Sequence, residues 1–128
     1  MKQEFSYFRK GEQTFPVIDV ELKGPKNNLT LKALVDSGAS FSVFRSEVAE
    51  YLGIEIEKGK QIYLEGIGGR ILGYFHKLSL RIGSKTFLCK IIFSPEMTVS
   101  FNLLGRNNFF VPFTISFQEK SKMIIIQD

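Results

Sequence analysis

The strongest chemical signal in the sequence is a single aspartate at the end of an apolar run. Asp36 follows "LKALV" and stands directly before Ser37 and Gly38, after which apolar residues resume at Phe41. A carboxylate can act as a general acid or base. Ser37 offers a hydroxyl for hydrogen bonding, and Gly38 permits a sharp turn or a close approach of another group. The alternative is an Asx-type turn between two strands, and the tripeptide alone favours that alternative.

The residue counts argue against several other chemistries. The 128-residue chain has one cysteine, Cys89, and one histidine, His76. A protein zinc site usually takes three or four Cys, His or carboxylate ligands, and these counts do not supply the usual set. A Ser-His or Cys-His nucleophile would have to use His76, which lies in the strand-like segment "GYFHKLSLRIG" and is better explained as a partly exposed strand residue. We therefore expect no metal and no cofactor.

Composition indicates one folded domain. The hydrophobic fraction of 44% and the charged fraction of 23% are typical of globular proteins, and we expect residues 1–128 to form a single domain. One cysteine excludes an intramolecular disulfide, and no apolar run reaches the length of a membrane span. The N-terminal segment "MKQEFSYFRKGEQ" has no signal-peptide core. These features favour a soluble cytoplasmic protein with no membrane partner.

Short alternating runs between turns predict an almost entirely β fold. "PVIDVELK" and "LTLKALV" flank the turn "GPKNN" and should form a hairpin, and "KLSLRI" and "TFLCKIIF" are joined by "GSK". The best helix candidate is residues 46–52, where Ser46 can cap the N-terminus and Gly53 can close the C-terminus. We expect a small closed or sandwiched β-domain with one or two short helices.

Three segments, in order, resemble those of the retropepsin-like aspartic proteases, the family of the retroviral proteases and their cellular relatives. "ALVDSGAS" resembles the active-site loop, "EGIGGRILG" resembles the glycine-rich flap, and "NLLGRNNFF" resembles the apolar-apolar-Gly-Arg segment near the C-terminus. The resemblance covers nearly the whole chain. It implies a small closed, barrel-like acid-protease fold that is active as a symmetric dimer.

The resemblance also implies a mechanism, that of an aspartic endopeptidase. Two aspartates share one proton and activate a water molecule, without a covalent intermediate; aspartic proteases are an established example of such a pair. Because the chain has one Asp-Ser-Gly, the resemblance implies a homodimer to which each subunit contributes Asp36. Ser37 would brace the two loops across the two-fold axis, and Gly38 and Ala39 would support the loop and leave room for substrate.

Two further segments receive roles from the same resemblance. The flap would be the hairpin around residues 62–75, with its tip near three residues, and its glycines would let it open over an extended peptide or protein substrate. Gly105 and Arg106 would form the structural Gly-Arg segment. The retroviral enzymes carry an acidic residue where this chain has Ser40, so Arg106 must find another partner. The predicted tip residues are Ile67, Gly68 and Gly69, and the candidates for substrate pockets are Leu34, Ile67, Ile71 and residues near Leu103.

Basic residues gather in the second half of the chain. The net charge is +4, and between residues 58 and 90 seven lysines and arginines oppose one acidic residue, Glu65. A preference for acidic substrates or an anionic partner would explain this excess. The interpretation that we prefer from the sequence is a set of solvated strand faces.

Two alternative functions remain open at this point. A catalytically silent module of the same fold would bind peptides without cleaving them, although an intact Asp36-Ser37-Gly38 argues against it. A basic β-barrel for single-stranded nucleic acid could use the 13 Phe and 4 Tyr as stacking groups. These aromatics mostly fall on apolar strand faces, where core packing explains them. We favour an aspartic-type endopeptidase that acts on peptides or proteins and has no nucleic-acid partner.

Overall fold

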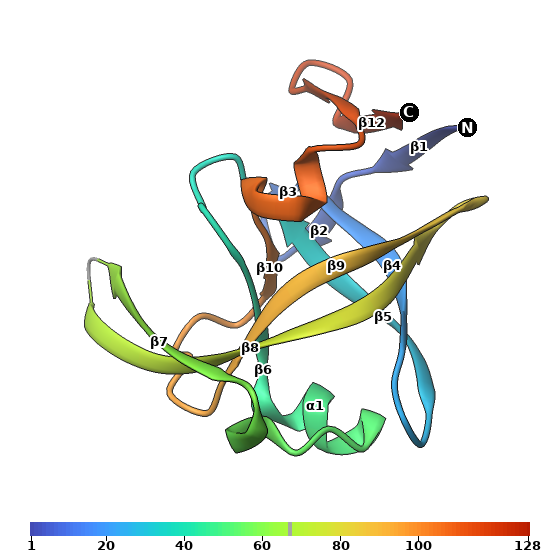
Figure 1. The fold of residues 1–128 in the computed structure, drawn as a ribbon. Coiled ribbons are helices and arrows are strands. Elements are labelled where there is room, and N and C mark those ends of the chain that lie inside the picture. The colour runs from blue at the N-terminus through green and yellow to red at the C-terminus, as the bar shows by residue number, and fades with distance from the viewer. Residues whose placement is uncertain (67) are drawn as a thin grey trace.

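The computed structural model describes residues 1–66 and 68–128, which form mainly β-strands (Figure 1). The largest sheet contains β4 (Val17–Lys23), β5 (Asn28–Val35), β6 (Ser42–Arg45), β7 (Lys60–Gly66), β8 (Gly69–Ile82), β9 (Lys85–Ser94) and β10 (Asn102–Leu104). Its order is β4-β5-β10-β6-β9-β8-β7, and β4 also pairs with β8. The additional pairing closes the sheet into a barrel and leaves β7 outside the closed ring. The predicted hairpins β4–β5 and β8–β9 are both present.

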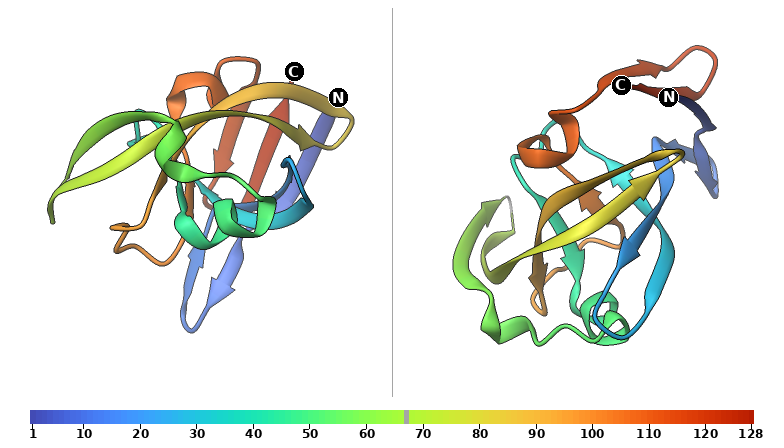
Figure 2. Two further views of the ribbon diagram at one scale, coloured as in Figure 1. Left: turned by 60° about the horizontal axis from the view of Figure 1, so that its bottom comes forward. Right: turned by 45° about the vertical axis from the view of Figure 1, so that its right-hand side comes forward.

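The two ends of the chain form a separate three-stranded sheet (Figure 2). β12 (Met123–Gln127) lies between β1 (Lys2–Ser6) and β11 (Thr114–Gln118), and both pairings are antiparallel. The Met1 ammonium group also contacts the Asp128 carboxylate at 2.6 Å. The last strand therefore closes on its own chain. Sequence reasoning did not predict β1, or the small hairpin of β2 (Phe8–Lys10) and β3 (Gln13–Phe15), because their residues are mostly polar.

The predicted helix is present as α1 (Ser46–Leu52). Gly53 ends it as expected, with φ of 84°, and donates its N–H to the carbonyls of Ala49 and Glu50. The prediction that Ser46 caps the N-terminus is wrong: Arg45 occupies the cap position and provides no side-chain cap. The cause is that β6 runs directly into α1, so Ser46 is already the first helical residue. One short helical turn, η1 (Ile56–Lys58), and the segment η2 (Arg106–Phe110) complete the elements. η2 is irregular, because Asn107 and Asn108 have non-helical backbone angles.

The core lies inside the barrel, and aromatic rings fill much of it. The rings of Phe44 and Phe93 meet edge to face at 6.3 Å, and both side chains are fully buried. Phe109 is also fully buried and packs against the neighbouring Phe113. Core packing therefore accounts for these phenylalanines. Within residues 1–66 and 68–128, no helix has the length and apolar character that crossing a membrane would require.

Candidate active site

The loop between β5 and β6, residues 36–41, holds Asp36 in a tight turn. The N–H of Gly38 donates to Oδ1 of Asp36 at 2.9 Å, and the N–H of Ala39 donates to the Asp36 carbonyl at 3.1 Å. A Cβ atom on Gly38 would lie 3.2 Å from the same Oδ1, a tight contact that glycine avoids. The Asp36 side chain is half-buried. The loop is thus an Asx-type turn. Because this turn orients the Asp36 carboxylate, it is compatible with a chemical role for that group.

The strand β10 and the residues that follow it hold this loop in place. β10 pairs in parallel with β5 and antiparallel with β6, so it lies between the two strands that the loop connects. The N–H of Asp36 donates to the Leu104 carbonyl at 3.0 Å. Beyond β10, the N–H groups of Arg106 and Asn107 donate to the carbonyls of Ala39 and Ser40 at 2.9 and 2.8 Å. The Asp-Ser-Gly loop and the Gly-Arg segment therefore form one hydrogen-bonded unit.

Gly105 is the residue that permits this close packing. It is buried, its N–H donates to Oγ of Ser42 at 3.0 Å, and a Cβ atom at this position would clash with the main chain of Phe41. Arg106 contributes its main chain to the loop, while its exposed guanidinium has no ion pair within the part of the chain that the structure describes. The hydroxyl of Ser37 is exposed on the same loop.

The predicted flap corresponds to a hairpin of β7 and β8. The pairing runs from Lys60–Phe75 to Gly66–Gly69, and the predicted tip residue Ile67 lies outside the described residues. Gly69 has φ of 108°, a conformation that favours glycine. A Cβ atom on any of the glycines 66, 68 and 69 would meet no atom within 4 Å. The described part of the tip is therefore open to solvent, in contrast to the loop of Asp36.

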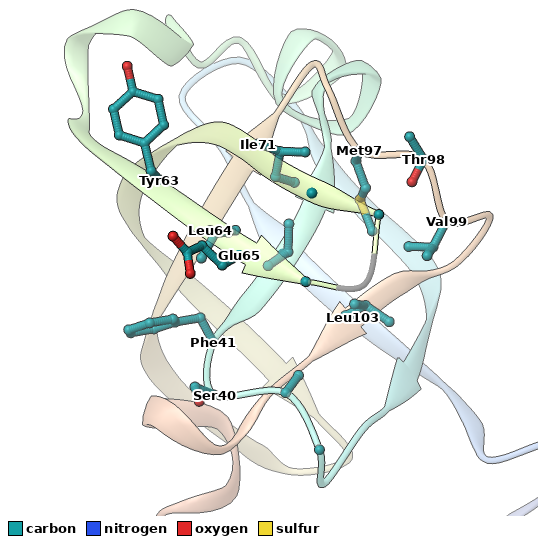
Figure 3. Close-up of a pocket in the computed structure, with 16 residues that line it drawn as sticks. Ser40, Phe41, Tyr63, Leu64, Glu65, Ile71, Met97, Thr98, Val99 and Leu103 are labelled. Carbon is teal, nitrogen blue, oxygen red and sulfur yellow. The ribbon is translucent and has the colours of Figure 1, made fainter.

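A cleft of about 720 Å³ lies between the loop and the hairpin (Figure 3). Its walls come from the loop at 38–41, from both strands of the hairpin, and from the irregular segment after β9. Asp36 itself does not line the cleft; the residues that follow it in the loop do. The described lining residues are Gly38, Ala39, Ser40, Phe41, Val43, Tyr63, Leu64, Glu65, Gly66, Gly68, Gly69, Ile71, Met97, Thr98, Val99 and Leu103.

The structure brings most of the predicted site residues together, and it adds others. Ile71 and Leu103 line the cleft, whereas the predicted pocket residue Leu34 does not. Sequence reasoning missed the wall formed by residues 97–99, which belongs to no motif. Arg45 positions this wall by donating from its guanidinium to the Val99 carbonyl at 2.9 Å. Such an arrangement has no signal in the sequence, because 54 positions separate the two residues.

The other reactive side chains have structural roles. Cys89 is fully buried, and this burial raises the pKa of its thiol to about 12, although a hydrogen bond with Ser42 acts in the opposite direction. A thiol in this state is a poor nucleophile. Nε2 of His76 is 2.8 Å from the Ile56 carbonyl, which ties β8 to η1. Among the described residues, no group of His, Cys, Asp and Glu side chains is arranged to hold a metal ion.

Comparison with known families agrees with this geometry. A family described as aspartyl protease matches residues 18–107, a span that contains the Asp36 loop, the hairpin and the Gly-Arg segment. The chain belongs to the aspartyl protease family. A search of curated proteins gives no significant match.

Two solved structures show that this aspartyl protease has the retropepsin fold. A retropepsin-like aspartic protease from Rickettsia conorii is 22% identical, with a TM-score of 0.67, over 98% of this chain and 90% of that one. The EIAV protease in complex with the inhibitor HBY-793 is 18% identical, with a TM-score of 0.58, over 77% of this chain and 88% of that one. The expected family and the expected barrel-like acid-protease fold are therefore confirmed.

Proposed function

We propose that this aspartyl protease is an endopeptidase whose active site forms between two copies of the chain, each contributing Asp36. The observation that carries the proposal is that two of the three aspartates form ion pairs and the third, Asp36, does not within the described residues. Asp19 is paired with Lys32 at 2.9 Å, and Asp128 is paired with the N-terminal ammonium group and with Lys85. Asp36 alone sits beside a cleft without an ion pair within the described residues. The second aspartate of the mechanism therefore has to come from a second copy.

The loop geometry supports this chemistry. The main-chain hydrogen bonds from Gly38 and to Leu104 hold Asp36 in place before substrate arrives, and such preorganisation reduces the cost of reaching the transition state. One carboxylate takes a proton from water while the other, protonated, polarises the scissile carbonyl. The exposed hydroxyl of Ser37 would then bond to the partner copy's loop and brace the pair of loops.

The terminal sheet supports a particular way of pairing. The Asp36 loop and the terminal sheet lie toward the same end of the molecule (Figures 1 and 2). Both edges of β12 are already used within the chain, so a second copy has no place beside that strand. In the proposed homodimer of the domain, residues 1–128, β12 of each copy therefore stays within its own terminal sheet, and the two Asp36 loops meet at the two-fold axis.

The cleft supports an extended peptide or protein as the substrate. Its side-chain walls are mostly apolar, with Leu64 and Ile71 on the hairpin opposite Leu103 and Val99 (Figure 3). Opening of the β7–β8 hairpin would admit the substrate, and its closure would exclude bulk water while the reacting water stays between the carboxylates. The main chain of an extended peptide would pair with the hairpin, while the apolar walls would select side chains near the scissile bond.

Peptide cleavage read by mass spectrometry tests the proposal. A diverse peptide mixture is incubated with the natural protein, with Asp36→Asn and with the matched control Asp19→Asn, at several pH values. Asp36→Asn should lower the cleavage rate by about 10²- to 10⁴-fold, because it removes acid–base chemistry at the reacting water. Asp19→Asn changes only an exposed ion pair and should leave the same cuts.

Two further measurements make the test decisive. Specific activity should rise with protein concentration, and an excess of the Asp36→Asn chain should inhibit the natural chain by forming mixed dimers. Cuts that persist in Asp36→Asn would contradict the mechanism. A sample shown to be dimeric that binds peptides but makes no Asp36-dependent cuts would identify a catalytically silent peptide-binding module instead.

A further inference from the structure

One face of β8 runs from the cleft onto the outer surface of the barrel. Side chains alternate along a strand, so Ile71, Phe75 and Lys77 lie on the same face of β8. Ile71 lines the cleft. The ring of Phe75 packs edge to face on the ring of Phe41 at 5.4 Å, and Phe41 stands at the side of the cleft (Figure 3). A peptide that leaves the cleft past Phe41 would therefore reach the part of β8 that carries Lys77.

Four lysines gather on this face. The strand registers place Lys90 opposite Lys77, Lys60 opposite Phe75, and Lys23 opposite Ser79, and directly opposed residues share a face. We call Lys23, Lys60, Lys77 and Lys90 the lysine face. None of the four has an ion pair among the described residues.

Nearby acidic side chains do not neutralise the lysine face. Glu21 is paired with Arg81 at 3.1 Å, and Asp19 is paired with Lys32 at 2.9 Å. Glu65, in the β7–β8 hairpin, is in register with Arg70 rather than with a lysine. The positive charge on this part of the sheet is therefore uncompensated within the described chain.

The chain offsets only part of the electrostatic cost of this arrangement. Like charges directly opposite in an antiparallel pair destabilise a sheet, and Lys77 and Lys90 are such a pair. Lys90 reduces the repulsion by placing its ammonium 4.3 Å from the centre of the Phe75 ring. Beside these lysines Leu88, opposite Ser79, leaves 69% of its surface exposed. A partner segment with acidic groups around an apolar side chain would be complementary both to the lysines and to Leu88.

We propose that the lysine face docks an acidic protein segment that carries an apolar residue for Leu88. In a substrate, this segment would lie outside the scissile stretch and continue from the cleft past Phe41. Docking itself does not require catalysis, whereas its effect on cleavage rests on the proposed function. The proposal replaces the interpretation from the sequence that these charges are only solvated strand faces.

The surface chemistry favours a protein segment over a nucleic acid. Single-stranded nucleic acids bind where aromatic rings are open for base stacking. The aromatic ring of the lysine face, Phe75, already packs on Phe41 and lies under the ammonium of Lys90. The exposed apolar side chain beside the lysines is the aliphatic Leu88.

Binding is tested first, with Asp36→Asn protein so that no probe is consumed. The probe is a fluorescent glutamate-rich peptide with interspersed leucines, and its control has glutamine in place of every glutamate. The glutamate peptide should bind more tightly, and the difference should shrink as salt is added. Lys77→Gln with Lys90→Gln should weaken its binding by about three- to tenfold, because exposed ion pairs are individually weak. Arg9→Gln with Lys120→Gln, which removes the same charge from exposed residues elsewhere, should not.

Several outcomes would overturn the proposal. Equal binding of the two peptides, or equal weakening by both pairs of substitutions, would mean that the lysine face is not a specific docking surface. Tighter binding of a labelled single-stranded oligonucleotide that depends on Lys77 and Lys90 would identify a different occupant. Thermal unfolding serves as the folding control. The Lys77 and Lys90 substitutions should change stability little, since they remove both a repulsive pair and the favourable contact of Lys90 with the Phe75 ring.

Cleavage provides the second arm and separates the two proposals. Peptides with a glutamate-rich extension should be cut with a lower KM than their glutamine versions, and the Lys77 and Lys90 substitutions should abolish that difference. Asp36-dependent cuts without any such difference would overturn the proposal that the docked segment continues from the cleft, and would leave the protease intact. Docking without Asp36-dependent cuts would overturn the proposed function alone.

Discussion

The loop that carries Asp36 and the β7–β8 hairpin on the other side of the cleft are built in opposite ways. The loop is tied by main-chain hydrogen bonds to Leu104, Arg106 and Asn107, and its neighbour Gly105 has no space for a side chain. The hairpin tip has glycines with open space around them. Main-chain hydrogen bonds are thus concentrated around the Asp36 carboxylate, and open space is concentrated at the hairpin tip. Under the proposed function, the first feature would position the carboxylate and the second would let a substrate enter. Glycine therefore permits close packing at position 105 and leaves open space at the hairpin tip, and only the surrounding atoms distinguish the two roles.

The largest expected effect concerns thiol labelling of Cys89, which tests how firmly the barrel next to the Asp36 loop stays closed. Cys89 lies on β9 and is hydrogen-bonded to Ser42, the first residue after the Asp36 loop. Burial raises its thiol pKa to about 12, against an ordinary value of 9.0. Near pH 8 this lowers the thiolate fraction about a thousandfold, so the folded protein should react with iodoacetamide at least that much more slowly than the unfolded chain. Rapid labelling without denaturant would show that the barrel next to the loop opens.

The same thiol predicts the direction of a pH effect. Folding favours the neutral thiol, because its folded pKa is above its unfolded value. The stabilisation is therefore complete below about pH 9 and is lost as the pH rises towards 12. The unfolding midpoint of the natural protein should fall through this window more steeply than that of Cys89→Ala.

One substitution made at two glycines tests the comparison directly. Gly105→Ala should lower the free energy of unfolding by about 3 kcal/mol, because its Cβ would clash with the fixed main chain of Phe41. Gly66→Ala adds the same methyl group where nothing lies within 4 Å, and should change stability by less than about 0.5 kcal/mol. Urea denaturation of both variants measures the difference. Similar losses at both positions would remove the distinction between the two regions.

Removal of the Ser42 hydroxyl, which accepts the N–H of Gly105, should cost less stability than Gly105→Ala. Oγ of Ser42 is buried and accepts the N–H of Gly105 at 3.0 Å. Ser42→Ala would leave that N–H without an acceptor and should lower the free energy of unfolding by about 2 kcal/mol. Ser40→Ala, at an exposed position two residues away, provides the control and should have little effect. A neutral Ser42→Ala would mean that the loop is held by its other hydrogen bonds alone.

The parts of the structure that depend on short-range sequence patterns could be predicted from the sequence. Alternation predicted the β4–β5 and β8–β9 hairpins, and the spacing of Ser46 and Gly53 located α1, although the cap residue was misjudged. The segments around Asp36 and Gly105 were recognised separately. Their joining through β10 depends on a parallel pairing with β5, and such a long-range contact leaves no local pattern.

The parts that sequence reasoning missed share a different physical cause. The cleft wall at Met97–Val99 is irregular and is placed by Arg45, so neither periodicity nor a motif marks it. The charge excess between residues 58 and 90 was visible, but its meaning depended on register. Only the pairing of β8 with β9 shows that Lys77 faces Lys90 instead of an acidic residue. Local composition therefore indicated the charge and not its arrangement.

The smallest expected effect concerns the base of the hairpin. The β8–β9 ladder ends at Tyr74 and Phe93, so Leu72 has no partner strand on that side. Its N–H instead donates to the Glu96 carboxylate at 2.8 Å, and its carbonyl accepts from Oγ of Ser94 at 2.6 Å. Glu96→Ala should cost less than about 1 kcal/mol of stability, since the carboxylate is exposed. Hydrogen exchange at the Leu72 amide should nevertheless become several times faster.

The matched variant Glu96→Gln separates positioning from charge. Glutamine keeps an oxygen that can accept the Leu72 N–H, so it should retain most of the slow exchange that alanine loses. In the cleavage assay, Glu96→Ala should raise KM more than it lowers kcat, because the hairpin would be less often in place to hold a peptide. Equal exchange in the natural protein and in Glu96→Ala would contradict this account. Glu96 would then have no part in holding the base of the hairpin at the end of the β8–β9 ladder.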